Sequence, residues 1–182
     1  MRVVGICGSL REGSFNRALL TAVAGALPPG VEFGEWNGLE TLPAYDADAD
    51  GQFAPPSVAA LRRALAGADA VVIATPEYNA SIPGALKNAL DWASRPFPDN
   101  CLRGKPVAVV GASTGVFGAV WAQADLRRIL KTVGADVLET ALPVAAAHHA
   151  FTVSGALRDR GLATTLRTIA HELVEQSIGR AA

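Results

Sequence analysis

Apolar runs of strand length alternate along the chain with segments whose apolar residues recur at helical spacing. This alternation is typical of an α/β fold built on a parallel sheet. The first run, residues 2–7, is rich in β-branched residues and does not alternate with polar positions, as expected for a strand covered on both faces. We expect four further strands, at residues 31–36, 70–75, 106–111 and 135–142.

Between these strands the spacing predicts helices that each bury one apolar face. The first helix should end at Pro28, the third should begin at Pro83 and close at Pro96, and the fourth should end at Gly134. The inward-facing residues are expected to be Leu19, Leu20, Val23 and Leu27, then Val58, Leu61, Leu65 and Ala68, then Leu126, Ile129, Leu130 and Val133, and finally Leu162, Leu166, Ile169 and Leu173. Residues 37–56 are interpreted as a long surface loop. The pattern therefore predicts five β/α units in one domain, residues 1–182.

Composition narrows the class of protein. Half of the 182 residues are apolar, which is enough for a sizeable core, and the net charge of −1 gives no bias toward nucleic acid or an anionic membrane. The apolar run at the N-terminus is too short for a signal peptide or a membrane span. Cys7 and Cys101 form no disulfide framework, so reduced thiols are the simpler interpretation. We expect a cytoplasmic protein with no nucleic-acid or membrane partner.

The loop after the first strand, residues 8–16 (GSLREGSFN), combines small polar residues with one arginine. It opens a helix, where backbone N–H groups and the helix dipole attract anions. Ser9, Ser14 and Asn16 offer hydrogen-bonding groups, and Arg11 adds a planar guanidinium that suits phosphate oxygens. Neither the GxGxxG fingerprint nor the GxxxxGK[ST] P-loop is present. The alternative is that Ser14 only caps the helix and Ser9 only shapes a turn.

The segment after the third strand, residues 75–92, reads TPEYNASIPGALKNALDW. Its stiff beginning presents an aromatic ring and an amide at the edge of the sheet, through Pro76, Glu77, Tyr78 and Asn79. A planar heteroaromatic ligand requires such an apolar or aromatic wall beside hydrogen-bond donors. The alternative is a turn that carries a surface tyrosine.

Residues 111–118 (GASTGVFG), after the fourth strand, contain three glycines that permit close backbone approach to a ligand. Ser113 and Thr114 add two hydroxyl groups. Glycine-rich turns between a strand and a helix also occur for packing reasons alone, so both interpretations stay open for this loop. In open parallel sheets ligands bind beyond the carboxyl ends of the strands, which is where all three loops are expected to meet.

These loops closely resemble those of the NADPH-dependent FMN reductase family, which includes quinone, chromate and azo-dye reductases. Residues 8–16 are similar to the family's Gly-Ser-x-Arg-x-x-Ser-x-Asn phosphate loop. Residues 76–92 resemble its Pro-Glu-Tyr-Asn-x-Ser-x-Pro-Gly-x-Leu-Lys-Asn-Ala-x-Asp-Trp signature at every fixed position. Length and element order match over essentially the whole chain, although the C-terminal third carries few motif residues.

The resemblance implies a flavodoxin-like fold, a doubly wound sheet of five parallel strands in the order 2-1-3-4-5 with helices on both faces. It also implies an FMN site in which Ser9, Arg11, Ser14 and Asn16 hold the phosphate. The ring and ribityl chain would lie along Pro76, Glu77, Tyr78 and Asn79, with Ser113 and Gly115 in the third contacting loop. Family members are usually homodimers or homotetramers, and packing or subunit contacts are expected of Lys87, Asp91 and Trp92.

The implied activity is hydride transfer from NADPH or NADH, through FMN, to a quinone-like or other small electron acceptor in a ping-pong cycle. FMN carries this chemistry, so no catalytic side chain is expected. A single anion-binding loop favours FMN over FAD. The alternative is a flavodoxin-type electron carrier that does not itself oxidise NAD(P)H, but such carriers are typically strongly acidic and lack an arginine in the phosphate loop.

Several other polar residues are interpreted as structural. His148 and His149 have no accompanying cysteine or carboxylate cluster, so a loop or interface role is favoured over a metal or acid–base role. His171 is assigned to a helix surface, and Cys7 to the role of a small buried hydrophobe. A solvated loop is expected for three alternating aspartates that lack the closing glutamate of a calcium loop, Asp46, Asp48 and Asp50. No metal site is predicted.

Overall fold

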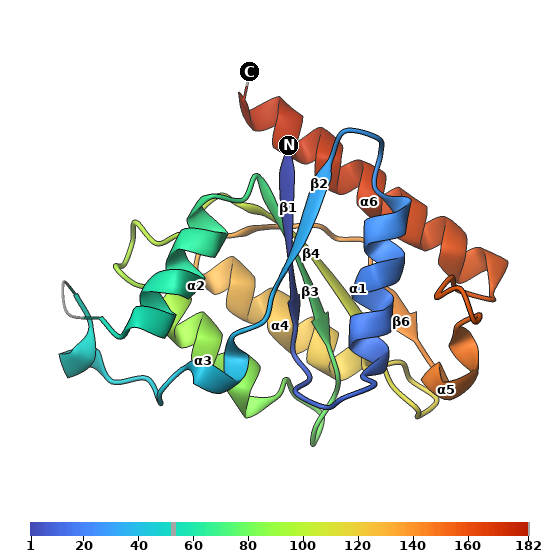
Figure 1. The fold of residues 1–182 in the computed structure, drawn as a ribbon, viewed down its shortest axis with the longest axis horizontal. Helices are drawn as coiled ribbons and strands as arrows, with labels where there is room; N and C mark the ends of the chain where they lie inside the picture. Colours follow the sequence, from blue (N-terminus) through green and yellow to red (C-terminus); the bar gives the residue numbers. More distant parts are fainter. Residues whose placement is uncertain (52–53, 182) are drawn as a thin grey trace.

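The apolar runs of the sequence form the strands of one parallel sheet. The computed structural model describes residues 1–51 and 54–181. Its sheet has the order β2 (Glu32–Trp36), β1 (Arg2–Cys7), β3 (Ala70–Thr75) and β4 (Pro106–Ala112), followed by β5 (Asp136–Val137), and every pairing is parallel. A further short strand, β6 (Leu142–Val144), also pairs with β4. The predicted order 2-1-3-4-5 is confirmed. Figure 1 shows the longer strands of this sheet between the helices.

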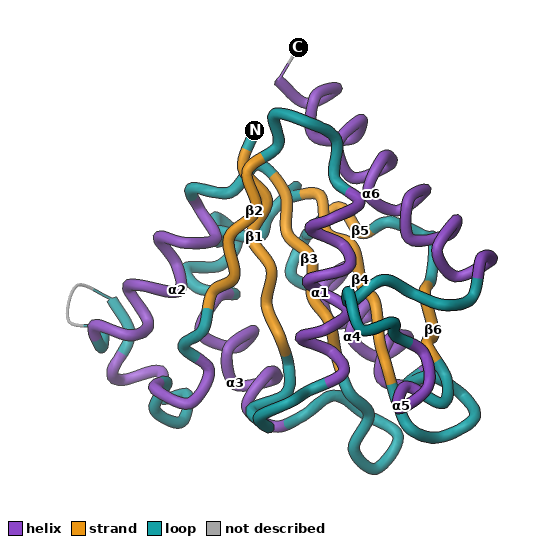
Figure 2. Tube along the Cα trace, turned by 45° about the vertical axis from the view of Figure 1, so that its right-hand side comes forward, coloured by secondary structure: helices purple, strands orange, loops and turns teal. Residues whose placement is uncertain are grey.

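Helices cover both faces of this sheet. One face packs against α2 (Pro56–Ala66), α3 (Gly84–Ala93) and α4 (Val120–Thr132). The other face packs against α1 (Phe15–Ala26) and α6 (Arg160–Ala181), and Figure 2 shows α1 and α6 across the sheet from α2 and α3. Successive residues of a strand point to opposite faces, so Val71 joins the first core and Val72 the second. All six residues of β3 are buried, as the run of apolar residues predicts.

The fifth strand departs from the predicted continuous run of residues 135–142. Val107 pairs with Val137 in β5, but Val110 pairs with Leu142 in β6, so four residues of the chain lie opposite two residues of β4. The guanidinium of Arg127 fills this break: it donates to the carbonyl of Val109 at 3.1 Å and to that of Thr140 at 2.8 Å. A side chain from α4 thus replaces backbone donors that a regular strand would supply.

The long loop 37–56 contains two single-turn helices, η1 (Leu39–Thr41) and η2 (Ala47–Ala49). Two side chains of α3, Asn88 and Trp92, hold this loop against the helix. Trp92 Nε1 and Asn88 Nδ2 both donate to the carbonyl of Pro43, at 2.9 and 2.8 Å, and Asn88 Oδ1 accepts from the N–H of Tyr45. The ring of Trp92 is fully buried within this chain, which agrees with a packing role.

Candidate functional site

The carboxyl ends of β1, β3 and β4 lie level in the sheet, with Cys7 opposite Ala74 and Thr75 opposite Gly111. The three loops singled out in the sequence leave the sheet at this edge and surround one open cavity of about 250 Å³. It is lined by Ser9, Arg11, Ser14, Phe15, Asn16, Pro76, Glu77, Tyr78, Ala112, Ser113 and Thr114. Residues far apart in the sequence are therefore brought together in one site.

The first loop ends as a cradle of backbone donors at the start of α1. Ser14 is the N-cap, and its Oγ accepts from the N–H of Asn16 at 3.2 Å. Gly13 has φ of +65°, a left-handed conformation that suits glycine and turns the chain sharply into the helix. Among the described residues, no protein acceptor takes the N–H groups of residues 12–15. Together with the exposed guanidinium of Arg11, this arrangement fits a phosphate group.

Asn16 uses its side chain to tie the first loop to the third. Its amide nitrogen donates to the carbonyl of Ala112 at 3.0 Å, and its amide oxygen accepts from the N–H of Ala112 at 2.9 Å. Both polar atoms of the buried amide are thereby engaged by one residue at the end of β4. Asn16 lines the cavity, but its hydrogen bonds hold the two loops in register with each other.

The second loop is a tight two-residue hairpin. Tyr78 and Ser81 exchange two backbone hydrogen bonds of 3.0 and 3.1 Å, and the two central residues, Asn79 and Ala80, both have positive φ. Positive φ at both central positions is the signature of a type I′ turn. The hairpin leaves the ring of Tyr78 half exposed beside Pro76 at the rim of the cavity. These two side chains give the site an aromatic and apolar wall.

Glu77 directs its carboxylate away from the first loop and onto α4. Its Oε2 accepts from the N–H groups of Trp121 and Ala122, both at 3.0 Å. These are the second and third residues of α4, so Glu77 caps that helix from a distant segment and places a negative charge at the positive end of its dipole. The second loop is fixed to the body of the protein by this contact.

The third loop is held on its far side by the last residue of β6 and the chain that follows it. The N–H of Ser113 donates to the carbonyl of Val144, and the N–H of Ala146 donates to the carbonyl of Gly115. Ser113 Oγ accepts from the N–H of Gly115 at 3.1 Å. Gly115 lies in an exposed turn next to the cavity and does not line it.

Backbone strain gathers at this edge of the sheet. In the described part of the chain, the four non-glycine residues with positive φ all follow the carboxyl ends of strands: Asn79, Ala80, Ala119 and Ala146. A left-handed alanine costs about 1–2 kcal/mol, so surrounding contacts must hold it. Such strain concentrates at ligand-binding sites more often than elsewhere in a fold.

Most of the sequence-predicted residues meet at the cavity. Asn79 lies at the tip of the hairpin and, like Gly115, belongs to a bordering loop without lining the cavity. Thr114, whose hydroxyl the sequence had singled out, also lines the cavity, together with two residues that the sequence did not indicate, Phe15 and Ala112. Phe15 stands inside the first motif and Ala112 inside the GASTG segment, so their positions, rather than their residue types, carried the available signal.

The residues interpreted as structural lie outside this cavity. Burial raises the pKa of the Cys7 thiol, whose Sγ donates to the carbonyl of Ser9 at 3.5 Å. His148 and His149 stand on a single helical turn, α5 (Ala147–Ala150), and His171 forms an exposed pair with Glu175 on α6. Among the described residues, no group of three or more His, Cys, Asp or Glu side chains could hold a metal ion. None of the described helices combines the length and hydropathy of a membrane span.

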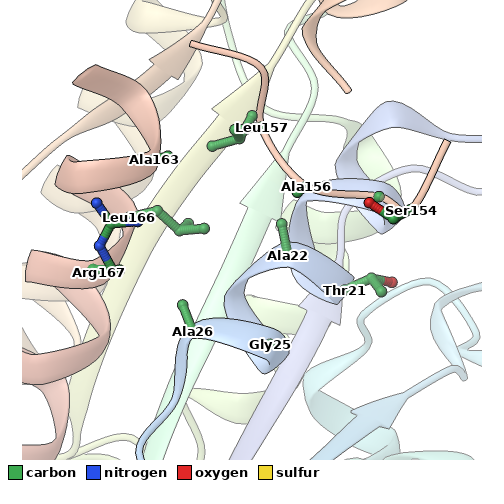
Figure 3. Close-up of a pocket in the computed structure, with 11 residues that line it drawn as sticks. Thr21, Ala22, Gly25, Ala26, Ser154, Ala156, Leu157, Ala163, Leu166 and Arg167 are labelled. Carbon is green, nitrogen blue, oxygen red and sulfur yellow. The ribbon is translucent and has the colours of Figure 1, made fainter. Parts of the chain in front are cut away.

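A second hollow, of about 260 Å³, lies between α1 and α6 (Figure 3). Its walls are Ala22, Ala26, Leu157 and Leu166, which come from these two helices and the segment that precedes α6. Arg167 is the one charged side chain among the described residues that line it. This hollow has no cradle of backbone donors and no convergence of polar groups, so we place the functional site at the strand ends.

Known proteins of similar sequence and structure identify the family of this chain. The sequence model of the NADPH-dependent FMN reductase family matches residues 1–150, which contain all three loops. The chain belongs to the NADPH-dependent FMN reductase family. An NAD(P)H-dependent FMN reductase of Pseudomonas aeruginosa is 40% identical over 179 residues, which cover 98% of this chain and 91% of that protein. A quinone reductase of Escherichia coli K12 is 43% identical over 139 residues, covering 76% of this chain and 73% of that protein.

A solved structure extends the likeness to the whole fold. FerB, a flavoenzyme NAD(P)H:(acceptor) oxidoreductase from Paracoccus denitrificans, superposes with a TM-score of 0.85 at 36% identity, covering 98% of this chain and 97% of that one. The family model and the similar reductases confirm the predicted family and the assignment to oxidoreductase enzymes. The FerB structure confirms the flavodoxin-like fold. FMN and NAD(P)H are the cofactor and reductant of that family, as predicted.

Proposed function

We propose that this protein carries hydride from NADPH or NADH, through bound FMN, to quinone-like or other small electron acceptors. The observation that carries the proposal is a cavity in which a phosphate cradle at the start of α1 and an aromatic wall lie together. One cradle suits the one phosphate of FMN, whereas FAD would add a second phosphate and an adenine. The relatives named as quinone reductases support the class of acceptor. We further propose that residues 1–182 act as one FMN-binding domain.

We propose the following roles for the residues of the site. The first loop holds the phosphate, and the loops after β3 and β4 flank the ring and the ribityl chain. Arg11 supplies the charge, whereas Asn16 and Glu77 fix backbone segments that contact the cofactor. The proposed site comprises Ser9, Arg11, Ser14, Asn16, Pro76, Glu77, Tyr78, Asn79, Ser113 and Gly115.

When bound, FMN supplies the hydride-accepting and hydride-donating chemistry of such enzymes. The chain supplies orientation and hydrogen-bond donors. Among the described lining residues, Arg11 and Glu77 are the charged ones, and the Glu77 carboxylate is engaged by α4. This favours a reaction without a protein acid–base pair, in which donor and acceptor use the same open face in turn.

The test begins with the visible spectrum of the purified protein, followed by release of the cofactor by heat and its identification by mass. Recovery of FMN is expected, and recovery of FAD would contradict the cofactor assignment. Anaerobic mixing with NADPH or NADH should bleach the flavin absorbance. Steady-state rates with a quinone should then give parallel double-reciprocal lines, the signature of a two-step exchange.

The electron-carrier alternative gives a different result in the same experiment. A flavodoxin-type carrier would hold FMN but would not be reduced directly by a nicotinamide cofactor. Failure of both NADPH and NADH to bleach the bound flavin would therefore favour the carrier. The near-neutral charge of the chain and the presence of Arg11 support the reductase.

We also propose that the protein is a homodimer or homotetramer. An apolar patch of four exposed side chains lies on the third loop and the start of α4: Val116, Phe117, Val120 and Trp121, called the Phe117 patch below. The rings of Phe117 and Trp121 pack edge to face with centroids 4.8 Å apart. An exposed aromatic cluster of this kind is typical of a surface that another chain covers. The two free thiols, Cys7 and Cys101, support a cytoplasmic location.

A further inference from the structure

The first two turns of α4 contact both loops that follow β3 and β4. Glu77 of the second loop accepts from the N–H groups of the second and third residues of the helix. Ser81, at the end of the same hairpin, donates to Asp125 Oδ2 at 2.6 Å. The third loop is reached by Gln123, whose Nε2 donates to the carbonyl of Gly118 at 3.0 Å. One rigid helix end therefore sets the position of two separate loops.

A glutamine at position 123 of α4 carries a cost in folding free energy. Its side chain is only 2% exposed, and its Oε1 is buried with no protein donor among the described residues. A buried acceptor without a partner destabilises a fold, whereas an apolar side chain of the same length would avoid that cost. The amide donor to Gly118 is the evident reason for a glutamine rather than a methionine.

The surroundings of Gln123 are shaped to admit its amide. A Cβ on Gly111 would lie 2.8 Å from Gln123 Nε2 and 3.0 Å from the carbonyl of Thr75, so only glycine leaves room for the side chain at the end of β4. Gln123 thus lies against Gly111 at the end of β4, close to where the third loop begins.

The segment held by Gln123 is strained. Gly118 and Ala119 both have left-handed φ, of +62° and +61°. A Cβ on Gly118 would lie 2.6 Å from the carbonyl carbon of Pro143, so the turn is pressed against β6. Ala119 pays a steric penalty for this conformation and begins α4 without a side-chain cap of its own. A strained turn of this kind requires an external contact to keep it in one conformation.

We propose that Gln123 is a positioning residue for the flavin site. Its amide fixes the Gly118–Ala119 turn and thereby sets the distance of the third loop, residues 113–118, from the bound flavin ring. The part of this inference that concerns the flavin rests on the proposed function, whereas the hold of Gln123 on the loop does not.

The test replaces Gln123 by methionine, which keeps the length of the side chain and removes the donor. In the apo-protein, amide hydrogen exchange of the peptide that spans residues 113–121 should speed up about 3- to 10-fold. In the holoprotein, the dissociation constant for FMN should rise by a similar factor, and the visible band of the bound flavin should shift. The melting temperature of the apo-protein should stay close to that of the wild type, because the buried unpaired acceptor is lost as well.

Two further variants separate positioning from stability. Leu130→Ala opens a cavity in the same helix away from the loops, so it should lower the melting temperature and leave the exchange of residues 113–121 and the flavin spectrum of the folded protein unchanged. Gln123→Glu should restore wild-type exchange and FMN affinity only at acidic pH. A protonated carboxyl group can donate to the Gly118 carbonyl, whereas a buried carboxylate repels it.

Unchanged exchange and unchanged FMN affinity in Gln123→Met would overturn the inference. So would an effect of Leu130→Ala on the loop as large as that of Gln123→Met. If the wild-type protein binds no FMN, the proposed function fails, while the exchange of the apo-protein still decides whether Gln123 holds the loop.

Discussion

Arg11 lines the cavity, and in the described part of the chain its charge forms no ion pair with a carboxylate. Its guanidinium donates to the carbonyl of Gly13 at 3.3 Å and lies over the ring of Phe15, 5.5 Å from the ring centroid. Both contacts orient the planar group beside the first turn of α1 without neutralising it. The residue is therefore poised to meet an anion at the cradle.

Replacement of Arg11 by alanine should weaken FMN binding and leave the apo fold intact. A hydrogen bond to a charged group contributes about 1.5–3 kcal/mol, and the exposure of Arg11 places it at the lower end, so we expect a loss of about 10- to 30-fold. Flavin fluorescence titration measures this change. Arg11→Lys keeps the positive charge but not the planar guanidinium. Its affinity for FMN should lie between those of the wild type and Arg11→Ala. Equal affinity in all three proteins would remove Arg11 from the site.

Asn16 and Glu77 show how a polar residue of a binding motif can serve the protein rather than the ligand. Both atoms of the Asn16 amide are taken up by Ala112, and the Glu77 carboxylate by the start of α4. The motifs correctly located the loops. The partners of these side chains lie 96 and 44 residues away, so no local pattern could reveal them.

The hairpin of the second loop carries strain that a substitution can relieve. Ala80 is exposed and has φ of +61° at the second central position of the turn, where glycine is the preferred residue. We expect Ala80→Gly to raise the free energy of unfolding by about 0.5–1 kcal/mol, because relief of the left-handed alanine exceeds the added entropy of the unfolded chain. Thermal unfolding should then show a rise in Tm of about 1–4 °C.

The matched control is the same substitution on the exposed side of α4. Ala124→Gly should lower the free energy of unfolding by about 1 kcal/mol, because glycine disfavours a regular helix. Opposite signs for these two alanines are the expected result. Destabilisation by Ala80→Gly would show that the left-handed conformation is not strained in solution.

The break in the fifth strand depends on Arg127. Besides the carbonyls of Val109 and Thr140, its Nε donates to the carbonyl of Leu138 at 3.4 Å. Burial lowers the pKa of this guanidinium. The three carbonyls that accept from Arg127 offset the free-energy cost of burying its charge.

Arg127→Met should lower the free energy of unfolding by about 2–3 kcal/mol, since it leaves partly buried carbonyls without a donor. Urea denaturation provides the measurement. Arg128→Met is the control, because Arg128 is exposed and pairs with Asp125, and its loss should cost no more than about 1 kcal/mol. Equal effects of the two variants would mean that the carbonyls find other donors.

At the scale of the whole molecule, the sequence predicted the layered architecture and the meeting of three loops at one sheet edge. Apolar periodicity located the four longer strands to within about a residue of their observed ends because these strands are buried along nearly all their length or begin at clear turn signals. The interrupted strand at residues 135–142 was misread because residues 138–141 (LETA) contain no glycine or proline to mark the break, and the Arg127 side chain that fills it belongs to another element. The single turn α5 left no periodic signal at all.

The Phe117 patch provides the prediction about assembly. Phe117→Ser combined with Trp121→Ser should shift the protein from an oligomer toward monomer in sedimentation at micromolar concentration, because the two largest apolar side chains of the surface are removed. Val153→Ser alters a fully exposed apolar residue outside the patch and should leave the sedimentation coefficient unchanged. A monomeric wild-type protein would contradict the proposal.

The bond from Asn16 to Ala112 also orders events during synthesis. The cradle at residues 8–16 leaves the ribosome long before the strand that anchors it, which lies 96 residues further along the chain. The pairing of β1 with β2 needs only the first 36 residues, whereas the three loops take their positions only after β4 and α4 have joined the sheet. The three loops can therefore meet only once the chain has been made through α4, which ends at Thr132, so the first motif cannot complete the cavity on its own.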